Sequence, residues 1–130
     1  MVRRCLVLLA VLAAGAAVVQ PAAAKDGVRA TLIGTIPKSA APGTAIVVSF
    51  TLRDRTGHPF NAERVFVTLI CPTRDASSTA FASNASHADG RYRIVAIVPA
   101  GGLGNMRIGL RGSTDVFFPI TNNPLAKPGR

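Results

Sequence analysis

The sequence predicts an all-β fold, an antiparallel sandwich of about seven strands, and three observations support this prediction. Hydrophobic and polar residues alternate along most of residues 28–120, as they do in strands that bury one face. No segment of this region carries hydrophobic residues at a sustained helical period. Turn signals rich in Gly, Pro and Asp separate the short strands at regular intervals, which is typical of sandwiches of the immunoglobulin-like type.

The first three predicted strands span residues 28–36, 44–53 and 64–71, and Pro37 ends the first of them. The second strand alternates most clearly, so one of its faces should pack on a core and the other should meet water. Its inward residues are Ile46, Val48, Phe50 and Leu52. Cys71 continues the apolar alternation of the third strand, so we expect it to be a buried core residue rather than a reactive thiol.

The second half of the chain predicts a weak edge strand followed by three further strands. These four strands span residues 79–85, 91–98, 103–111 and 116–120. Asp89-Gly90 is a pair that favours a hairpin turn. Tyr92 follows this turn at the start of a strong strand, which suits a tyrosine corner, where the hydroxyl bonds to backbone a few residues upstream.

Residues 1–24 are predicted to be a cleaved signal peptide. Two arginines precede an apolar stretch from Cys5 to Val19, and Ala22-Ala23-Ala24 offers the small residues that a signal peptidase needs. A membrane anchor is the alternative, but a spanning helix needs about 20 apolar residues. We therefore expect cleavage after about Ala24 and a secreted or periplasmic mature chain that does not span a membrane. Within the mature chain, we expect a sandwich domain over residues 25–121 and a disordered tail over residues 122–130.

A basic excess is the main functional signal in the sequence. Without the two arginines of the leader, 13 basic and 6 acidic residues remain, a net charge of +7. An excess of this kind indicates association with an acidic partner rather than a particular fold. Nucleic acid is excluded as the partner, because the chain is expected outside the cytoplasm and its single Tyr, without any Trp, offers little to stack on bases.

Four arginines on two predicted strands alternate against inward hydrophobic residues and should point outward. They are Arg91, Arg93, Arg107 and Arg111. If the turn at residues 99–103 closes a hairpin, Arg91 lies opposite Arg111, and such like-charge pairs are mildly destabilising. A face that keeps them could bind phospholipid headgroups, an acidic glycan or an acidic protein. The alternative interpretation is a solvated face, with Asp89 and Asp115 neutralising the charge.

Metal binding and catalysis find less support in the residues. His58 and His87 are the candidate metal ligands; both fall in predicted turns, and they lie 29 residues apart. Copper and zinc sites need two to four converging ligands, so the sequence leaves only a copper site at this pair of histidines as a candidate. No serine has a nucleophile-elbow context, and no glycine-rich phosphate loop leads into a helix. We therefore expect no enzymatic activity and no catalytic residues.

The turn and strand motifs together resemble bacterial secreted immunoglobulin-like modules, and most closely YtkA-like domains, over roughly residues 28–120. The motifs are Pro42-Gly43, the segment from Asp54 to Phe60, a Val-rich strand and Asp89-Gly90-Arg91-Tyr92. The resemblance implies an exported, non-catalytic domain, sometimes linked to metal handling or membrane-complex biogenesis. This chain lacks the usual Trp after the late glycine turn and a Met/His-rich segment, which argues against a copper role.

These observations lead to one functional expectation and one alternative. We expect an exported, non-catalytic binding module of the bacterial cell envelope that recognises an envelope protein or an anionic surface through a basic sheet face. The alternative is a periplasmic accessory in copper handling or membrane-complex assembly.

Overall fold

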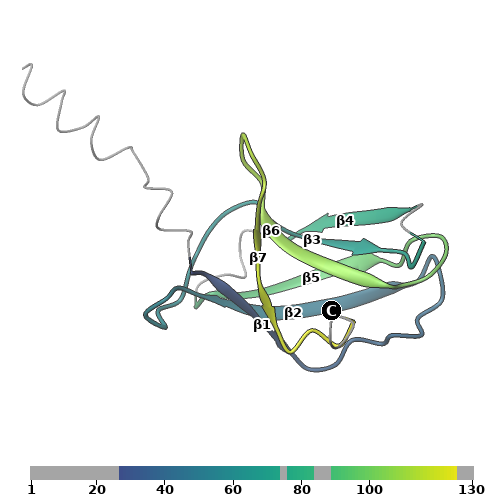
Figure 1. The fold of residues 1–130 in the computed structure, drawn as a ribbon, viewed down its shortest axis with the longest axis horizontal. Helices are drawn as coiled ribbons and strands as arrows, with labels where there is room; N and C mark the ends of the chain where they lie inside the picture. The colour runs from purple at the N-terminus through teal and green to yellow at the C-terminus, as the bar shows by residue number, and fades with distance from the viewer. Residues whose placement is uncertain (1–26, 74–75, 84–88, 126–130) are drawn as a thin grey trace, which may run out of the picture.

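The computed structural model describes residues 27–73, 76–83 and 89–125, and these residues form a sandwich of two four-stranded sheets (Figure 1). The strands are β1 (Arg29–Ile33), β2 (Ala45–Arg53), β3 (Val65–Ile70), β4 (Ser77–Phe81), β5 (Arg91–Ile97), β6 (Asn105–Leu110), β7 (Val116–Phe118) and β8 (Ile120–Thr121). Sheet A has the order β5-β2-β1-β8 and sheet B the order β4-β3-β6-β7. The predicted immunoglobulin-like β-sandwich is confirmed.

The core lies between the two sheets, and it is formed by the residues that the alternation assigns inward. The inward residues of β2 and β5 are between 0% and 5% exposed, and those of β3 are fully buried. Phe50 and Tyr92 face each other across β2 and β5 with their rings stacked at 5.3 Å. Such close cross-strand packing is what fixes the register of a sheet with one buried face.

The last predicted strand, residues 116–120, is two short strands in different sheets. β7 pairs with β6 in sheet B, whereas β8 pairs in parallel with β1 in sheet A. Pro119 lies between them and lacks the N–H that would continue the ladder to β6. Its carbonyl instead accepts a hydrogen bond from the backbone N–H of Ala30 in β1, at 2.9 Å. The chain therefore crosses from one sheet to the other at this proline, and the described residues form eight strands where about seven were expected.

The prediction of a disordered tail from Asn122 is wrong for residues 122–125. The side chain of Asn122 accepts a hydrogen bond from the backbone N–H of Leu32 and donates one to its carbonyl, at 3.1 and 3.3 Å. In this way the amide extends the short pairing of β8 with β1. Leu125 is 9% exposed and belongs to the core cluster. The folded domain thus continues past the predicted boundary at residue 121, because one apolar side chain in a polar tail is anchored by the core.

The hairpin between β5 and β6 that the sequence left open does not form. β5 pairs with β2 at the edge of sheet A, and β6 lies between β3 and β7 in sheet B. The connection from Pro99 to Gly104 therefore bridges the two sheets. At its far end the backbone N–H of Gly104 bonds to the carbonyl of Ile70 in β3, at 2.8 Å. Arg91 and Arg111 are therefore not opposite each other.

Tyr92 does not form the expected tyrosine corner with backbone a few residues upstream. Its hydroxyl donates to the carbonyl of Phe60 at 2.7 Å and accepts from the backbone N–H of Ala62 at 3.0 Å. Both partners belong to the loop between β2 and β3. Burial raises the pKa of the Tyr92 hydroxyl above its ordinary value. The residue therefore fastens this loop to the core.

Three further sequence predictions concern the edge strand β4, the burial of Cys71 and the signal peptide. β4 is an edge strand as expected, although it spans Ser77–Phe81 and begins two residues earlier than predicted. Cys71 is 2% exposed, which confirms its predicted burial. The predicted signal peptide, residues 1–24, lies outside the described residues. Within those residues, no helix is long and apolar enough to cross a membrane.

Candidate functional site

The outer face of sheet A changes from basic to apolar along its strands. At one end Arg29 of β1 lies directly opposite Arg53 of β2. In the next two rows Arg91 and Arg93 of β5 are paired with Thr51 and Ser49 of β2. Alternation places all these side chains on the side away from the core. We call Arg29, Arg53, Arg91 and Arg93 the basic end of sheet A.

The basic end has little internal neutralisation. None of its four arginines forms an ion pair with an Asp or Glu of the described residues. One guanidinium nitrogen of Arg53 donates to the carbonyl of Gly57 at 2.9 Å, which is a neutral acceptor. Hydroxyl side chains separate the arginines, with Thr31 and Thr51 as a cross-strand pair between β1 and β2. The result is a surface of donors that is complementary to phosphate or carboxylate groups.

The other end of the same face is apolar. Val47 and Val95 are opposite each other in β2 and β5, and Ile97 lies in the following row. These three side chains are 41%, 51% and 48% exposed. Ile33 of β1 adds a fourth exposed aliphatic side chain in the row of Arg93. An exposed apolar strip beside a charged region is typical of a surface that meets a partner.

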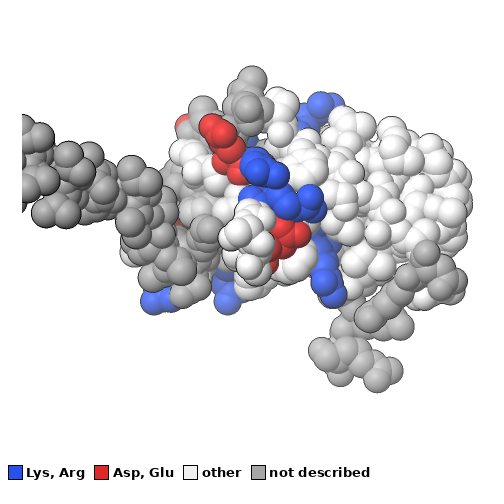
Figure 2. Space-filling model, turned by 90° about the horizontal axis from the view of Figure 1, so that it is seen from above, with Lys and Arg blue, Asp and Glu red and all other residues white. Residues whose placement is uncertain are grey.

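The structure divides the four arginines singled out from the sequence between two sheets. Arg91 and Arg93 belong to the basic end of sheet A, but Arg107 and Arg111 lie on the outer face of sheet B. Figure 2 looks down from the side on which β4, β3 and β6 lie in Figure 1, and it shows Lys and Arg side chains crossing this face with Asp or Glu beside them. The single four-arginine face expected from the sequence is therefore wrong.

Arg107 and Arg111 stack on a row of aromatic side chains that crosses sheet B. Arg111 lies over the rings of Phe66 and Phe81, at 5.0 and 5.2 Å from their centroids. Arg107 lies over Phe117 at 5.3 Å. Cation–π contacts of this kind stabilise exposed sites by about 0.5–1 kcal/mol each. These two arginines thus cover exposed aromatic surface.

An ion pair reinforces one of these stacks. The Nε of Arg111 lies 2.9 Å from a carboxylate oxygen of Asp115, although the angle is not that of a hydrogen bond. Both side chains are about a third exposed, so the pair contributes at most about 1 kcal/mol. The expected neutralisation by Asp115 thus applies to Arg111, on sheet B, and leaves the basic end of sheet A charged.

Gly109 makes the aromatic row possible. It is the register partner of both Phe66 and Phe117, and it lies between their rings. A Cβ at this position would come within 2.7 Å of the ring of Phe66 and of the carbonyl of Val116. The two rings instead meet edge to face over the glycine, with centroids 5.9 Å apart.

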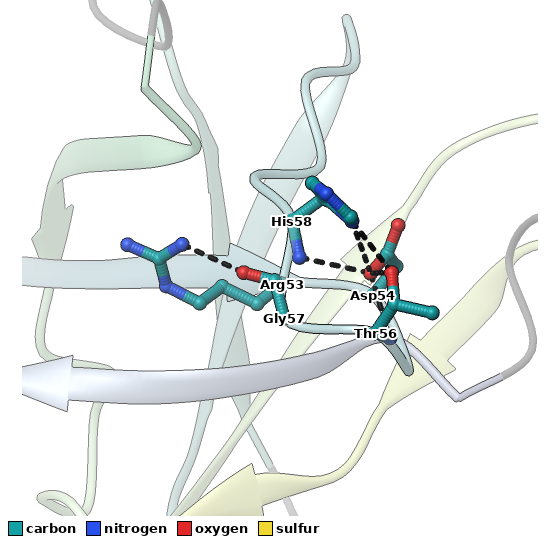
Figure 3. A network of polar contacts seen from close by, with 5 residues as sticks. All are labelled: Arg53, Asp54, Thr56, Gly57 and His58. Atoms are coloured by element: carbon teal, nitrogen blue, oxygen red, sulfur yellow. Dashed lines mark hydrogen bonds and ion pairs between the residues drawn. The ribbon is translucent and has the colours of Figure 1, made fainter.

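His58, one of the two candidate metal ligands, is part of a turn between β2 and β3 (Figure 3). One carboxylate oxygen of Asp54 accepts hydrogen bonds from the backbone N–H and the hydroxyl of Thr56 and from the backbone N–H of His58, at 2.9, 2.7 and 3.0 Å. The hydrogen bond from the Thr56 hydroxyl is the main cause that lowers the pKa of Asp54, followed by that from the His58 backbone.

The imidazole of His58 is held by the same turn. Its Nδ1 is 2.6 Å from the hydroxyl of Thr56, and its side chain is 77% exposed. This hydrogen bond leaves Nε2 as the nitrogen available to solvent. Among the described residues, no three side chains of His, Cys, Asp or Glu gather where they could hold a metal ion. His87 lies outside the described residues, so the predicted copper site at His58 and His87 stays a prediction.

Two members of the basic end, Arg29 and Arg53, were not identified as site residues from the sequence. Alternation already places Arg53 outward in β2, but its position beside Arg91 depends on the pairing of β2 with β5, and that of Arg29 depends also on the pairing of β1 with β2. An antiparallel alignment of residues 29–33 with residues 49–53 places Arg29 opposite Arg53, and it would have identified this pair from the sequence.

Comparisons with protein-family models, with curated proteins and with solved structures find no match for this chain. The resemblance to YtkA-like domains therefore remains a sequence-based prediction.

Proposed function

We propose that this chain is an exported, non-catalytic binding module that attaches to an anionic phospholipid surface through the outer face of sheet A. The observation that carries this proposal is the placement of four arginines beside four exposed aliphatic side chains on one sheet face. The arginines match phosphate groups, and the aliphatic side chains match the apolar material beneath them. An acidic envelope protein would need the same complementarity and is the outcome to test against.

The charge of the basic end sets the expected strength of attachment. Each Arg close to an anionic membrane surface contributes about 1 kcal/mol at moderate salt. Four such residues give about 4 kcal/mol, which corresponds to a dissociation constant near the millimolar range. Burial of exposed aliphatic side chains adds to this at about 25 cal/mol per Å². The attachment is therefore expected to be reversible and sensitive to salt.

The test compares vesicles that contain phosphatidylglycerol with vesicles of phosphatidylcholine alone. We expect the purified protein to sediment with the anionic vesicles only, and the variant Arg91→Ser/Arg93→Ser to bind about 30-fold more weakly, since two arginines contribute about 2 kcal/mol. The matched control is Lys38→Ser/Arg64→Asn. It removes the same charge from exposed loop positions, and Asn tolerates the positive φ of 63° at residue 64.

Two results would count against the proposal. Equal loss of binding in both double variants would show that net charge alone drives attachment, without a dedicated face. Binding to neither vesicle, together with salt-sensitive capture of one acidic envelope protein by the wild type but not by Arg91→Ser/Arg93→Ser, would assign the face to a protein partner. The alternative of a copper or membrane-complex accessory stays a sequence-based prediction beside this proposal.

A further inference from the structure

A second site lies at the edge of the sandwich where β7 leaves sheet B. β7 pairs only with the second half of β6, residues 108–110. At Pro119 the chain turns away and joins β1 in sheet A. Among the described residues, the first half of β6, residues 105–107, therefore has β3 on one side and no strand of sheet B on the other. We call the resulting opening between β6 and β8 the β6–β8 notch.

The notch is a pocket of about 370 Å³. Its apolar lining comes from Met106, Phe117, Phe118 and Ile120. Met106 and Phe118 are core residues, 2% and 5% exposed, so the pocket reaches the edge of the hydrophobic core between the two sheets. Its volume lies at the lower end of the range for small-molecule sites, roughly 300–1,000 Å³. The shape therefore suits a small ligand with a short apolar part.

Each of two asparagines on the rim accepts one backbone hydrogen bond through its side-chain oxygen. The side-chain oxygen of Asn105 accepts the backbone N–H of Met106 at 2.8 Å. That of Asn123 accepts the backbone N–H of Leu125 at 2.9 Å. Each amide also carries an NH₂ group with two N–H donors that a ligand could use. Both rim asparagines therefore present donors to whatever occupies the notch.

Arg107 supplies the positive charge of the notch. Its guanidinium lies over the ring of Phe117, which also lines the pocket, and it forms no ion pair with an Asp or Glu of the described residues. Among the residues that line the pocket, none is acidic. The polar side chains of the rim thus offer N–H donors, and no acidic residue of the lining accepts from them. Such a set of donors suits an anionic ligand.

We propose that the β6–β8 notch binds a short-chain aliphatic carboxylate, with the carboxylate at Arg107, Asn105 and Asn123 and the alkyl chain against Met106, Phe118 and Ile120. This site is separate from the surface that the proposed function uses, because the notch involves sheet B and the strand crossing to β8. A whole phospholipid is too large for it, whereas a carboxylate on a chain of a few carbons satisfies the rim donors and covers the exposed edge of the core.

The test is an NMR titration of the ¹⁵N-labelled protein with hexanoate, with hexanol as the uncharged control. We expect hexanoate to shift the amide signals of residues 105–107, 117–120 and 123, and hexanol to bind at least about tenfold more weakly, since charge-assisted hydrogen bonds dominate the affinity. Arg107→Gln should weaken hexanoate binding at least about tenfold. The matched control Arg93→Gln, on sheet A, should leave it unchanged.

A second variant keeps the test decisive if Arg107→Gln alters folding. Asn105→Asp/Asn123→Asp retains both acceptor oxygens for the backbone N–H groups of Met106 and Leu125. It also places negative charge on the rim, so hexanoate binding should be lost while the fold persists. Equal hexanoate affinity in this variant and the wild type would overturn the proposal. Shifts confined to the basic end of sheet A, or equal binding of hexanol, would overturn it as well.

Discussion

Arg29 and Arg53 offer a direct way to separate binding from stability, because they oppose each other across β1 and β2. Two like charges in register on exposed strands destabilise a sheet by a few tenths to about 1 kcal/mol. Arg29→Glu removes this repulsion and creates an opposite-charge pair at the same register. We expect the free energy of unfolding to rise by about 0.5–1 kcal/mol at low salt.

Urea unfolding at neutral pH measures this change, provided that the slope of the transition stays constant. Arg29→Gln is the matched control, since it removes the repulsion without adding an attraction, and its stability should fall between those of the wild type and Arg29→Glu. High salt should reduce the gain, because screening weakens exposed charge pairs. The same Arg29→Glu variant should bind phosphatidylglycerol vesicles more weakly than the wild type.

A gain in stability with a loss of vesicle binding would show that the Arg29–Arg53 pair contributes to binding while it destabilises the fold. If Arg29→Glu unfolds at the same urea concentration as the wild type at low salt, the two guanidinium groups do not interact across the strands. The reasoning from register to repulsion would then be refuted.

Three further predictions concern the scaffold around these sites. Tyr92→Phe should lower the free energy of unfolding, measured in urea, by about 1–3 kcal/mol, because it leaves two backbone partners of the hydroxyl unsatisfied. Burial raises the pKa of Tyr92 in the folded state, so the wild type should also lose stability relative to this variant as the pH rises above about 10. Gly109→Ala should destabilise the domain by about 1–3 kcal/mol in the same assay, through overpacking of the aromatic row, and an unchanged midpoint would contradict that geometry. Asp54→Ala should speed amide hydrogen exchange at Thr56 and His58, because it removes the carboxylate that accepts both N–H groups. The pKa of Asp54 is lowered in the folded state, so these two amides of the wild type should lose their protection from exchange only as the pH falls below about 4.

Local alternation predicted which side chains are buried, because the side-chain period of a strand is a property of the strand alone. It placed Phe50, Tyr92 and Cys71 inward, and all three are buried. It also placed Arg91 and Arg93 outward, where the basic end of sheet A lies. Those parts of the fold and of the candidate site follow from the sequence.

Sheet membership could not be predicted in the same way. The alternation of β5 and β6 is identical whether residues 99–104 close a hairpin or bridge two sheets, so Arg107 and Arg111 were assigned to the wrong face. The prediction of a disordered tail was wrong for residues 122–125 for a similar reason. A single buried apolar residue, Leu125, gives no periodic signal, and neither do the hydrogen bonds that join Asn122 to β1. Contacts between distant segments decide both points.

The face that meets the membrane can be identified most directly with a single tryptophan, because the natural chain contains none. Val95→Trp places the reporter on the outer face of sheet A, and Phe81→Trp places it on that of sheet B; the native side chains are 51% and 45% exposed. With vesicles that contain phosphatidylglycerol, we expect the fluorescence of Val95→Trp to shift to the blue and that of Phe81→Trp to stay unchanged. A shift in Phe81→Trp alone, or in neither variant, would contradict the assignment of the outer face of sheet A as the binding surface.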